Sequence, residues 1–170
     1  ARMVQEAMKQ AGINSDEPAA LIGHSQGGIV AATIASDLKD DYDVKHVVTA
    51  GSPVANHPIP DKTWVTSVEM DDELVAALDG APNPNSEHWL TVRGTASKSD
   101  NNPKSTFAGT PVIDAPDNKE ITHWLKYHQA AYQNATDMGS SAMKTHEQHF
   151  DEILDGDLQE VMYFEGRMSK

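Results

Sequence analysis

The chain has 170 residues, of which 38% are hydrophobic, so it is long enough to form one compact domain with its own core. Its formal net charge of −13 repels phosphate backbones, which argues against nucleic acid as a partner. It contains no cysteine, which excludes disulfides, a thiolate nucleophile and a cysteine-ligated zinc site.

Residues 2–12 predict a first helix, and the stretch after the following loop is the most informative part of the chain. Residues 19–28 read Ala-Ala-Leu-Ile-Gly-His-Ser-Gln-Gly-Gly, an apolar run that leads directly into the pattern Gly-x-Ser-x-Gly. The apolar run predicts a buried strand. Residues 29–38 are rich in alanine and isoleucine and predict a helix with a wide buried face.

Ser25 lies on the sharp turn between this strand and this helix, where the backbone of the serine must be strained. The residues two before and two after it, Gly23 and Gly27, are expected to lack bulk because the chain folds back on itself there. The turn also directs the backbone N–H of Gln26 toward any oxyanion that forms beside Ser25. Ser25 is therefore the candidate nucleophile, and an incidental serine in a glycine-rich turn is the alternative interpretation.

The sequence Gly-His-Ser-Gln-Gly-Gly resembles the nucleophile elbow of the α/β-hydrolase superfamily, in the form found in its lipases, esterases and thioesterases. The resemblance implies an α/β fold with a mostly parallel sheet and helices on both faces. In that superfamily the elbow follows the fifth strand of an eight-stranded sheet, whereas Ser25 lies near the start of this sequence. We therefore expect residues 1–170 to form a single domain that is the C-terminal, catalytic portion of a hydrolase, with the N-terminal strands missing.

Further strands are predicted downstream of the elbow, mainly from β-branched residues bounded by turn residues. They are expected at residues 44–50, 63–68 and 89–93, with a short one at 110–113. One helical turn is expected over residues 74–78. Residues 94–109 are rich in Ser, Asn, Lys and Gly and predict an exposed loop.

Two helices are predicted after the strands. The first begins either at Asp117, where Asp-x-x-Glu resembles a capping box, or at Thr122. The second covers residues 140–154 and is amphipathic and polar. Its His146 and His149 lack the i, i+4 spacing of a metalloprotease pair, so we expect a solvated helix face, no metal and no other cofactor.

A serine nucleophile needs a general base, usually histidine, and a carboxylate that orients the imidazole. In this superfamily the chain order is serine, acid, histidine. Asp72 is the candidate acid, because Asp72-x-x-Val75 follows a predicted strand and resembles the Asp-x-x-Val turn that carries the acid in these hydrolases. We prefer Asp72 to Asp71, and a solvated acidic loop is the alternative. Weaker rivals are Asp79, Asp114 and Asp117.

His123 and His128 are the candidate bases, since both follow the last predicted strand. His123 is favoured if the helix begins at Thr122, and His128 is favoured if it begins at Asp117. His24, next to the nucleophile, is expected to point away from it and to pack or bond locally.

The resemblance implies hydrolysis of a carboxylic ester or thioester in a small-molecule substrate, with Ser25, Asp72 and His123 as the triad and Gln26 in the oxyanion hole. A second oxyanion donor normally comes from a loop after the third strand, which lies outside this sequence. An acyltransferase with the same triad and a non-catalytic, hydrolase-like binding module are the alternatives. Because the strand at 19–22 would lack one neighbour, we expect either self-association along its edge or a separate chain bearing the missing half.

Overall fold

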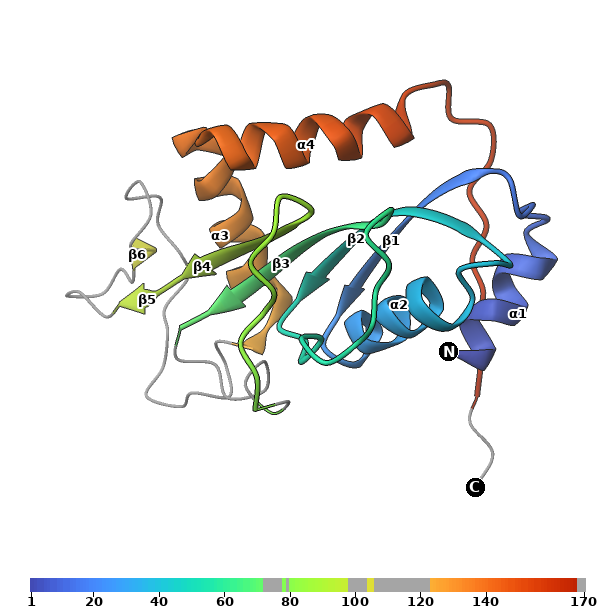
Figure 1. Ribbon diagram of the computed structural model, residues 1–170, viewed down its shortest axis with the longest axis horizontal. Coiled ribbons are helices and arrows are strands. Elements are labelled where there is room, and N and C mark those ends of the chain that lie inside the picture. Colours follow the sequence, from blue (N-terminus) through green and yellow to red (C-terminus); the bar gives the residue numbers. More distant parts are fainter. Residues whose placement is uncertain (72–77, 79, 98–103, 106–122, 168–170) are drawn as a thin grey trace.

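The computed structural model describes residues 1–71, 78, 80–97, 104–105 and 123–167. These residues form a four-stranded, all-parallel sheet with helices on both faces (Figure 1). The expectation of an α/β fold with a mostly parallel sheet is thereby confirmed.

The elements follow the order expected from the sequence around the elbow. Helix α1 precedes strand β1, which leads through the elbow into helix α2, and three more parallel strands and two helices follow. Their bounds are α1 Arg2–Gln10, β1 Pro18–His24, α2 Gln26–Asp37, β2 Asp43–Ala50, β3 Trp64–Met70, β4 Trp89–Gly94, β5 Ala96–Ser97, β6 Lys104–Ser105, α3 Leu125–Met138 and α4 Ser141–Leu154.

The sheet has the strand order β1-β2-β3-β4. The register between β1 and β2 shifts once, because Ala19 pairs with Val44 and the next residue of β1 pairs with His46. This irregularity helps place Val47 in the core under α2, while His46 faces α4 on the other side of the sheet. Among the described strands, β1 pairs with β2 alone and lies at an edge.

Each face of the sheet carries its own apolar core, because each is covered by two helices (Figure 1). The first cluster joins α1 and α2 to β2 and contains Met8, Ala31, Ile34, Ala35, Tyr42, Val44 and Val47. The second joins α3 and α4 to β3 and β4 and contains Val68, Met70, Val92, Tyr127, Ala131 and Met143. Ser25 directly follows β1, so the candidate nucleophile lies at the carboxyl end of the sheet, between the two helix layers.

Two sequence-based expectations about the second half of the chain are wrong. Helix α3 begins at Leu125 and not at Asp117 or Thr122, because Trp124 has an extended backbone with ψ 142° and is the N-cap. The expected loop at 94–109 contains the short antiparallel strands β5 and β6. Residues 74–77 and 110–113, where a helical turn and a strand are expected, lie outside the described residues.

Beyond α4 the chain returns alongside α1 (Figure 1), where Gly166 lies against Met3. This segment contains neither helix nor strand and exposes apolar side chains such as Leu158 and Tyr163. No helix in the described part of the chain is long and apolar enough to cross a membrane.

Candidate active site

The backbone of Ser25 is strained, as expected for a serine at a strand-to-helix elbow. Its φ of 55° and ψ of −122° make it the only residue other than glycine with positive φ among those the structure describes. The last residue of β2 and the turn after it hold this conformation. The Ser25 N–H donates to the Ala50 carbonyl at 2.8 Å, and the Ser25 carbonyl accepts from Ser52 Oγ at 2.8 Å and from Gly28 N–H at 3.0 Å.

The glycines of the elbow differ in how much space they leave. A Cβ atom on Gly23 would overlap backbone atoms of Gly27 and Gly28, so glycine is required there, as expected. A Cβ on Gly27 would meet nothing within 4 Å, so the expectation that bulk is excluded at this position is wrong. The position that excludes bulk is Gly28, where a Cβ would overlap the side chain of Ser52.

The structure brings His123 to Ser25. The imidazole Nε2 lies 2.7 Å from Ser25 Oγ, and both side chains are half-buried. His123 comes from the segment immediately before α3, a different part of the chain from the elbow. If the Ser25 hydroxyl donates to Nε2, the neutral imidazole carries its proton on Nδ1, which is the tautomer a general base requires.

His128, the alternative base, has a different environment. It is buried, and its Nδ1 lies 3.0 Å from the carbonyl oxygen of Trp124. Its ring lies 6.2 Å from the His123 ring, centroid to centroid. His24 does not bond locally, contrary to the expectation, because its Nε2 lies 2.6 Å from the carbonyl oxygen of His123. The catalytic role of either candidate base stays a prediction.

The candidate acid Asp72 lies outside the described residues, as do its rivals Asp79, Asp114 and Asp117. Its neighbour Asp71 is described, and its carboxylate is engaged at the surface. It accepts a hydrogen bond from the Thr95 hydroxyl and pairs with Arg93 at 3.9 Å.

Gln26 is the first residue of α2, directly after the candidate nucleophile. The N–H groups of the first helical turn have no acceptor within their own helix, and they lie at the positive end of the helix dipole. The Gln26 N–H therefore has the position that an oxyanion donor next to Ser25 requires.

The expectation of a solvated face at His146 and His149 is wrong, because α4 directs these side chains at the sheet. His146 is buried, and the half-buried His149 stacks on Trp64 with ring centroids 4.2 Å apart. Together with His46 and Thr66 they form a hydrogen-bonded row, which we call the histidine cluster.

The hydrogen bonds of the histidine cluster run in one direction. The Glu87 carbonyl must accept from His146 Nε2 at 3.0 Å, which leaves His146 Nδ1 to accept from the Thr66 hydroxyl at 3.1 Å. Thr66 in turn accepts from His46 Nε2 at 2.8 Å, and His46 Nδ1 accepts from His149 Nδ1 at 3.0 Å. Two of these bonds require neutral rings, because His146 Nδ1 accepts from Thr66 and His46 Nδ1 accepts from His149.

Burial and the neighbouring imidazoles disfavour positive charge in the cluster. They lower the pKa of His46 to about 3, and burial also lowers the pKa of His146 and of His149. Among the described residues, no group of three or more histidines and acids is arranged to hold a metal ion. The cluster is a contact that joins α4 to β2 and β3.

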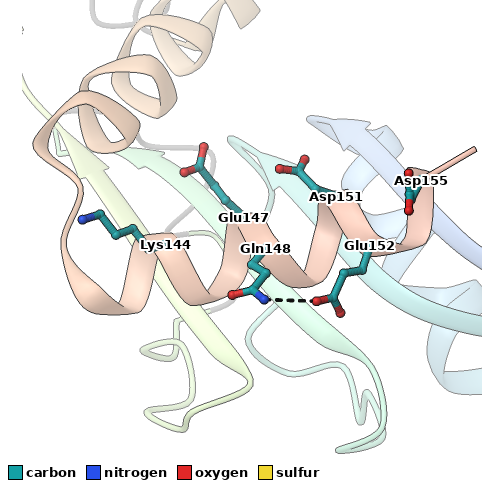
Figure 2. A pocket seen from close by; sticks show the side chains of 6 residues that line it. All are labelled: Lys144, Glu147, Gln148, Asp151, Glu152 and Asp155. Carbon is teal, nitrogen blue, oxygen red and sulfur yellow. Dashed lines mark hydrogen bonds between the residues drawn. The ribbon is translucent and has the colours of Figure 1, made fainter.

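A shallow hollow lies on α4 (Figure 2). The dashed line in Figure 2 is the hydrogen bond that Gln148 Nε2 donates to Glu152 Oε1 at 3.2 Å, between two of the lining side chains. All of its lining residues come from this one helix: Lys144, Glu147, Gln148, Asp151, Glu152 and Asp155. None of the candidate site residues lines it, so the elbow and His123 define the candidate active site.

The family model described as PGAP1-like alpha/beta domain matches residues 2–108. The matched range includes the elbow, Gln26 and Asp72, and it ends before His123. Neither the search of curated proteins nor the search of solved structures found a match.

Proposed function

This chain belongs to the PGAP1-like alpha/beta domain family of the α/β-hydrolase superfamily, and we propose that it is a serine hydrolase acting through Ser25. The proposed substrate is a small molecule with a carboxylic ester or thioester bond. The observation that carries the proposal is the 2.7 Å contact between His123 Nε2 and Ser25 Oγ at a strained elbow.

In the first half of the proposed reaction, His123 Nε2 takes the hydroxyl proton as Ser25 Oγ attacks the substrate carbonyl. The Gln26 N–H then donates to the oxyanion of the tetrahedral intermediate, a contribution of about 3 to 4 kcal/mol for one such donor. When the intermediate collapses, the bond to the alcohol or thiol breaks and His123 returns the proton to that leaving group. The acyl group stays on Ser25.

In the second half, water replaces the alcohol or thiol. His123 takes a proton from the water as the water oxygen attacks the acyl carbonyl. When this second intermediate collapses, His123 returns the proton to Ser25 Oγ and the carboxylic acid leaves. Asp72 is the proposed partner of the imidazolium, because its carboxylate would accept from Nδ1 and hold the correct tautomer. The engagement of Asp71 with Thr95 and Arg93 supports the choice of Asp72 over its neighbour.

The position of His123 also bears on the non-catalytic alternative. A hydrolase-like binding module has no need of an imidazole at its elbow serine, whereas a general base must lie within hydrogen-bond reach of the proton it removes. The contact between His123 and Ser25 therefore favours an enzyme. An acyltransferase would use the same residues, and product analysis in the presence of an alcohol acceptor separates it from a hydrolase.

The proposal is tested by the hydrolysis of short p-nitrophenyl esters. We expect the wild-type chain to hydrolyse them and Ser25→Ala to lose activity by about 1,000-fold or more while it keeps its fold. Ser86→Ala, a change at an exposed serine before β4, is the matched control and should keep wild-type activity. Turnover that is retained in the Ser25→Ala variant would end the proposal.

A further inference from the structure

His24 links the elbow to the segment that carries His123. Its backbone lies between Gly23 and the candidate nucleophile, at the end of β1, and its Nε2 lies 2.6 Å from the carbonyl oxygen of His123. A carbonyl oxygen can only accept, so this nitrogen carries the hydrogen and donates it. The residue next to the nucleophile thus holds the backbone of the residue that would activate it.

His123 lies before α3 and outside the helix. The helix begins two residues later, and its N-cap, Trp124, has an extended backbone and no side-chain capping bond. Two successive carbonyl groups in this segment accept from imidazoles. His24 donates to the carbonyl of His123, and His128 donates from Nδ1 to the carbonyl of Trp124 at 3.0 Å.

The rings of these histidines also pack together. The His24 ring lies 5.0 Å from the His123 ring and 5.6 Å from the His128 ring, centroid to centroid. A shift of His24 would therefore change both the hydrogen bond and the packing beside the candidate base.

We propose that His24 is a positioning residue, whose N–H holds His123 at hydrogen-bond distance from Ser25. This inference rests on the proposed function. General-base catalysis depends strongly on such placement, since a misplacement of about 1 Å can cost about 100-fold in rate. A purely structural His24 would instead stabilise the junction of β1 and α3 and leave the reactivity of Ser25 unchanged in the folded protein.

The test measures the rate at which a fluorophosphonate probe labels Ser25 in the whole chain, as a function of pH. His24→Gln keeps an amide N–H close to the place of Nε2, whereas His24→Phe keeps the ring and removes the donor. His24→Asn keeps an amide that is one bond too short to reach. We expect labelling to slow by about 10- to 100-fold in the Phe and Asn variants and by no more than about threefold in the Gln variant.

The pH profile separates positioning from a general loss of folded protein. Wild-type labelling should fall at acid pH, where an imidazole base is protonated. In the Phe and Asn variants this fall should be weaker, because less of the remaining reaction passes through His123. Circular dichroism establishes that each variant is folded, and the Gln and Asn pair decides the question if the Phe variant does not fold. His57→Phe, in the proline-containing loop, is the control and should label at the wild-type rate.

The remaining outcomes distinguish a failure of the positioning role of His24 from a failure of the proposed function. If the wild type labels at Ser25 and the Phe and Asn variants label as fast, His24 has no positioning role although the proposed function stands. The same conclusion follows if the Gln variant is as slow as the Asn variant, because the N–H is then not the operative group. If the wild type does not label at Ser25, both the proposed function and this inference are wrong.

Discussion

Gly28 lies against Ser52 with no space between them for a Cβ atom. The Ser52 hydroxyl in turn donates to the carbonyl oxygen of Ser25 at 2.8 Å. The conformation of the elbow therefore depends on the turn after β2, and that turn can approach it only because position 28 has no side chain.

Gly28→Ala is expected to destabilise the protein by about 2 kcal/mol, because the added methyl group must displace Ser52. Gly27→Ala is the matched control, since a Cβ there meets nothing and alanine favours a helix. For the control we expect the free energy of unfolding to stay the same or to rise by up to about 1 kcal/mol. Urea unfolding followed by circular dichroism measures both variants.

A second substitution shows whether Gly28→Ala destabilises the protein through overlap of its methyl group with Ser52 or through another effect of alanine. In the Gly28→Ala background, Ser52→Gly removes the atoms that the methyl group would overlap and should restore part of the lost stability. Equal destabilisation by Gly27→Ala and Gly28→Ala, or additive effects of Gly28→Ala and Ser52→Gly, would contradict this account.

The acid of the triad can be assigned by two neighbouring substitutions. Asp72→Asn should lower the esterase rate by about 1,000-fold or more, because the imidazolium loses its anionic partner and the imidazole loses its tautomer control. Asp71→Asn should change the rate by less than about tenfold, since the Asp71 carboxylate is engaged with Thr95 and Arg93. Measurements of kcat/KM on p-nitrophenyl esters compare the two variants. The reverse ranking would move the acid by one residue.

The histidine cluster predicts that stability falls at acid pH. In the unfolded chain His46 binds a proton near its ordinary pKa of 6.5, whereas in the folded protein its pKa is about 3. Stability from this residue is therefore complete above 6.5 and is lost as the pH falls from 6.5 toward 3. Between pH 7.5 and 5 the free energy of unfolding should decrease by about 2 kcal/mol from His46 alone. The lowered pKa values of His146 and His149 act in the same direction.

Urea unfolding at these two pH values tests the prediction. His46→Val should weaken the pH dependence, because the variant no longer carries the group that must stay neutral in the folded state. A free energy of unfolding that is the same at both pH values in the wild type would mean that the cluster binds protons as readily when folded.

The exposed edge of β1 leads to a prediction about assembly. Among the described strands only β2 pairs with β1, and the side chain of Ile22 in β1 is 72% exposed. Strand edges with unpaired backbone groups favour pairing with another chain. We expect the wild type to self-associate, and Ile22→Lys to shift it toward the monomer of 18.5 kDa. Size-exclusion chromatography with light scattering measures the mass.

Met138→Lys is the matched control for this edge, because Met138 is also an exposed apolar residue but lies at the end of α3. It should leave the mass distribution unchanged. A wild-type chain that is monomeric at every concentration would contradict self-association, and an equal effect of both lysines would place the contact elsewhere.

The sequence predicted the fold well wherever local patterns carried the information. The β-branched runs at residues 44–50 and 63–68 form strands that are largely buried within the parallel sheet. The apolar run before Ser25 also forms a strand, but the expectation that it is buried is wrong, because β1 lies at the edge of the sheet and most of its residues are half-buried or exposed. The start of α3 was predicted wrongly because Trp124, the actual N-cap, contributes no side-chain capping bond that a sequence pattern could reveal. Asp117 and Thr122 offered better caps by composition.

The wrong expectations about the elbow and the histidine cluster have a common physical cause, which is that the decisive contacts join residues far apart in the chain. The spacing of His146 and His149 on a polar helix predicts a solvated face, yet Thr66 and the Glu87 carbonyl satisfy the ring nitrogens of His146 in a buried position. Ser52 is a second example, because its hydroxyl supports the elbow from a turn that is distant in the chain. The one sequence feature that indicates this contact is the place of Ser52 in the turn after β2, the strand beside β1.

Covalent labelling decides whether Ser25 is the activated nucleophile. The wild-type chain is treated with a fluorophosphonate probe, and the modified peptide is identified by mass spectrometry. We expect a single adduct on Ser25, which is lost in Ser25→Ala and forms much more slowly in His123→Ala, with the other serines unmodified. An adduct on a different residue, or the absence of any adduct in the folded wild type, would contradict it.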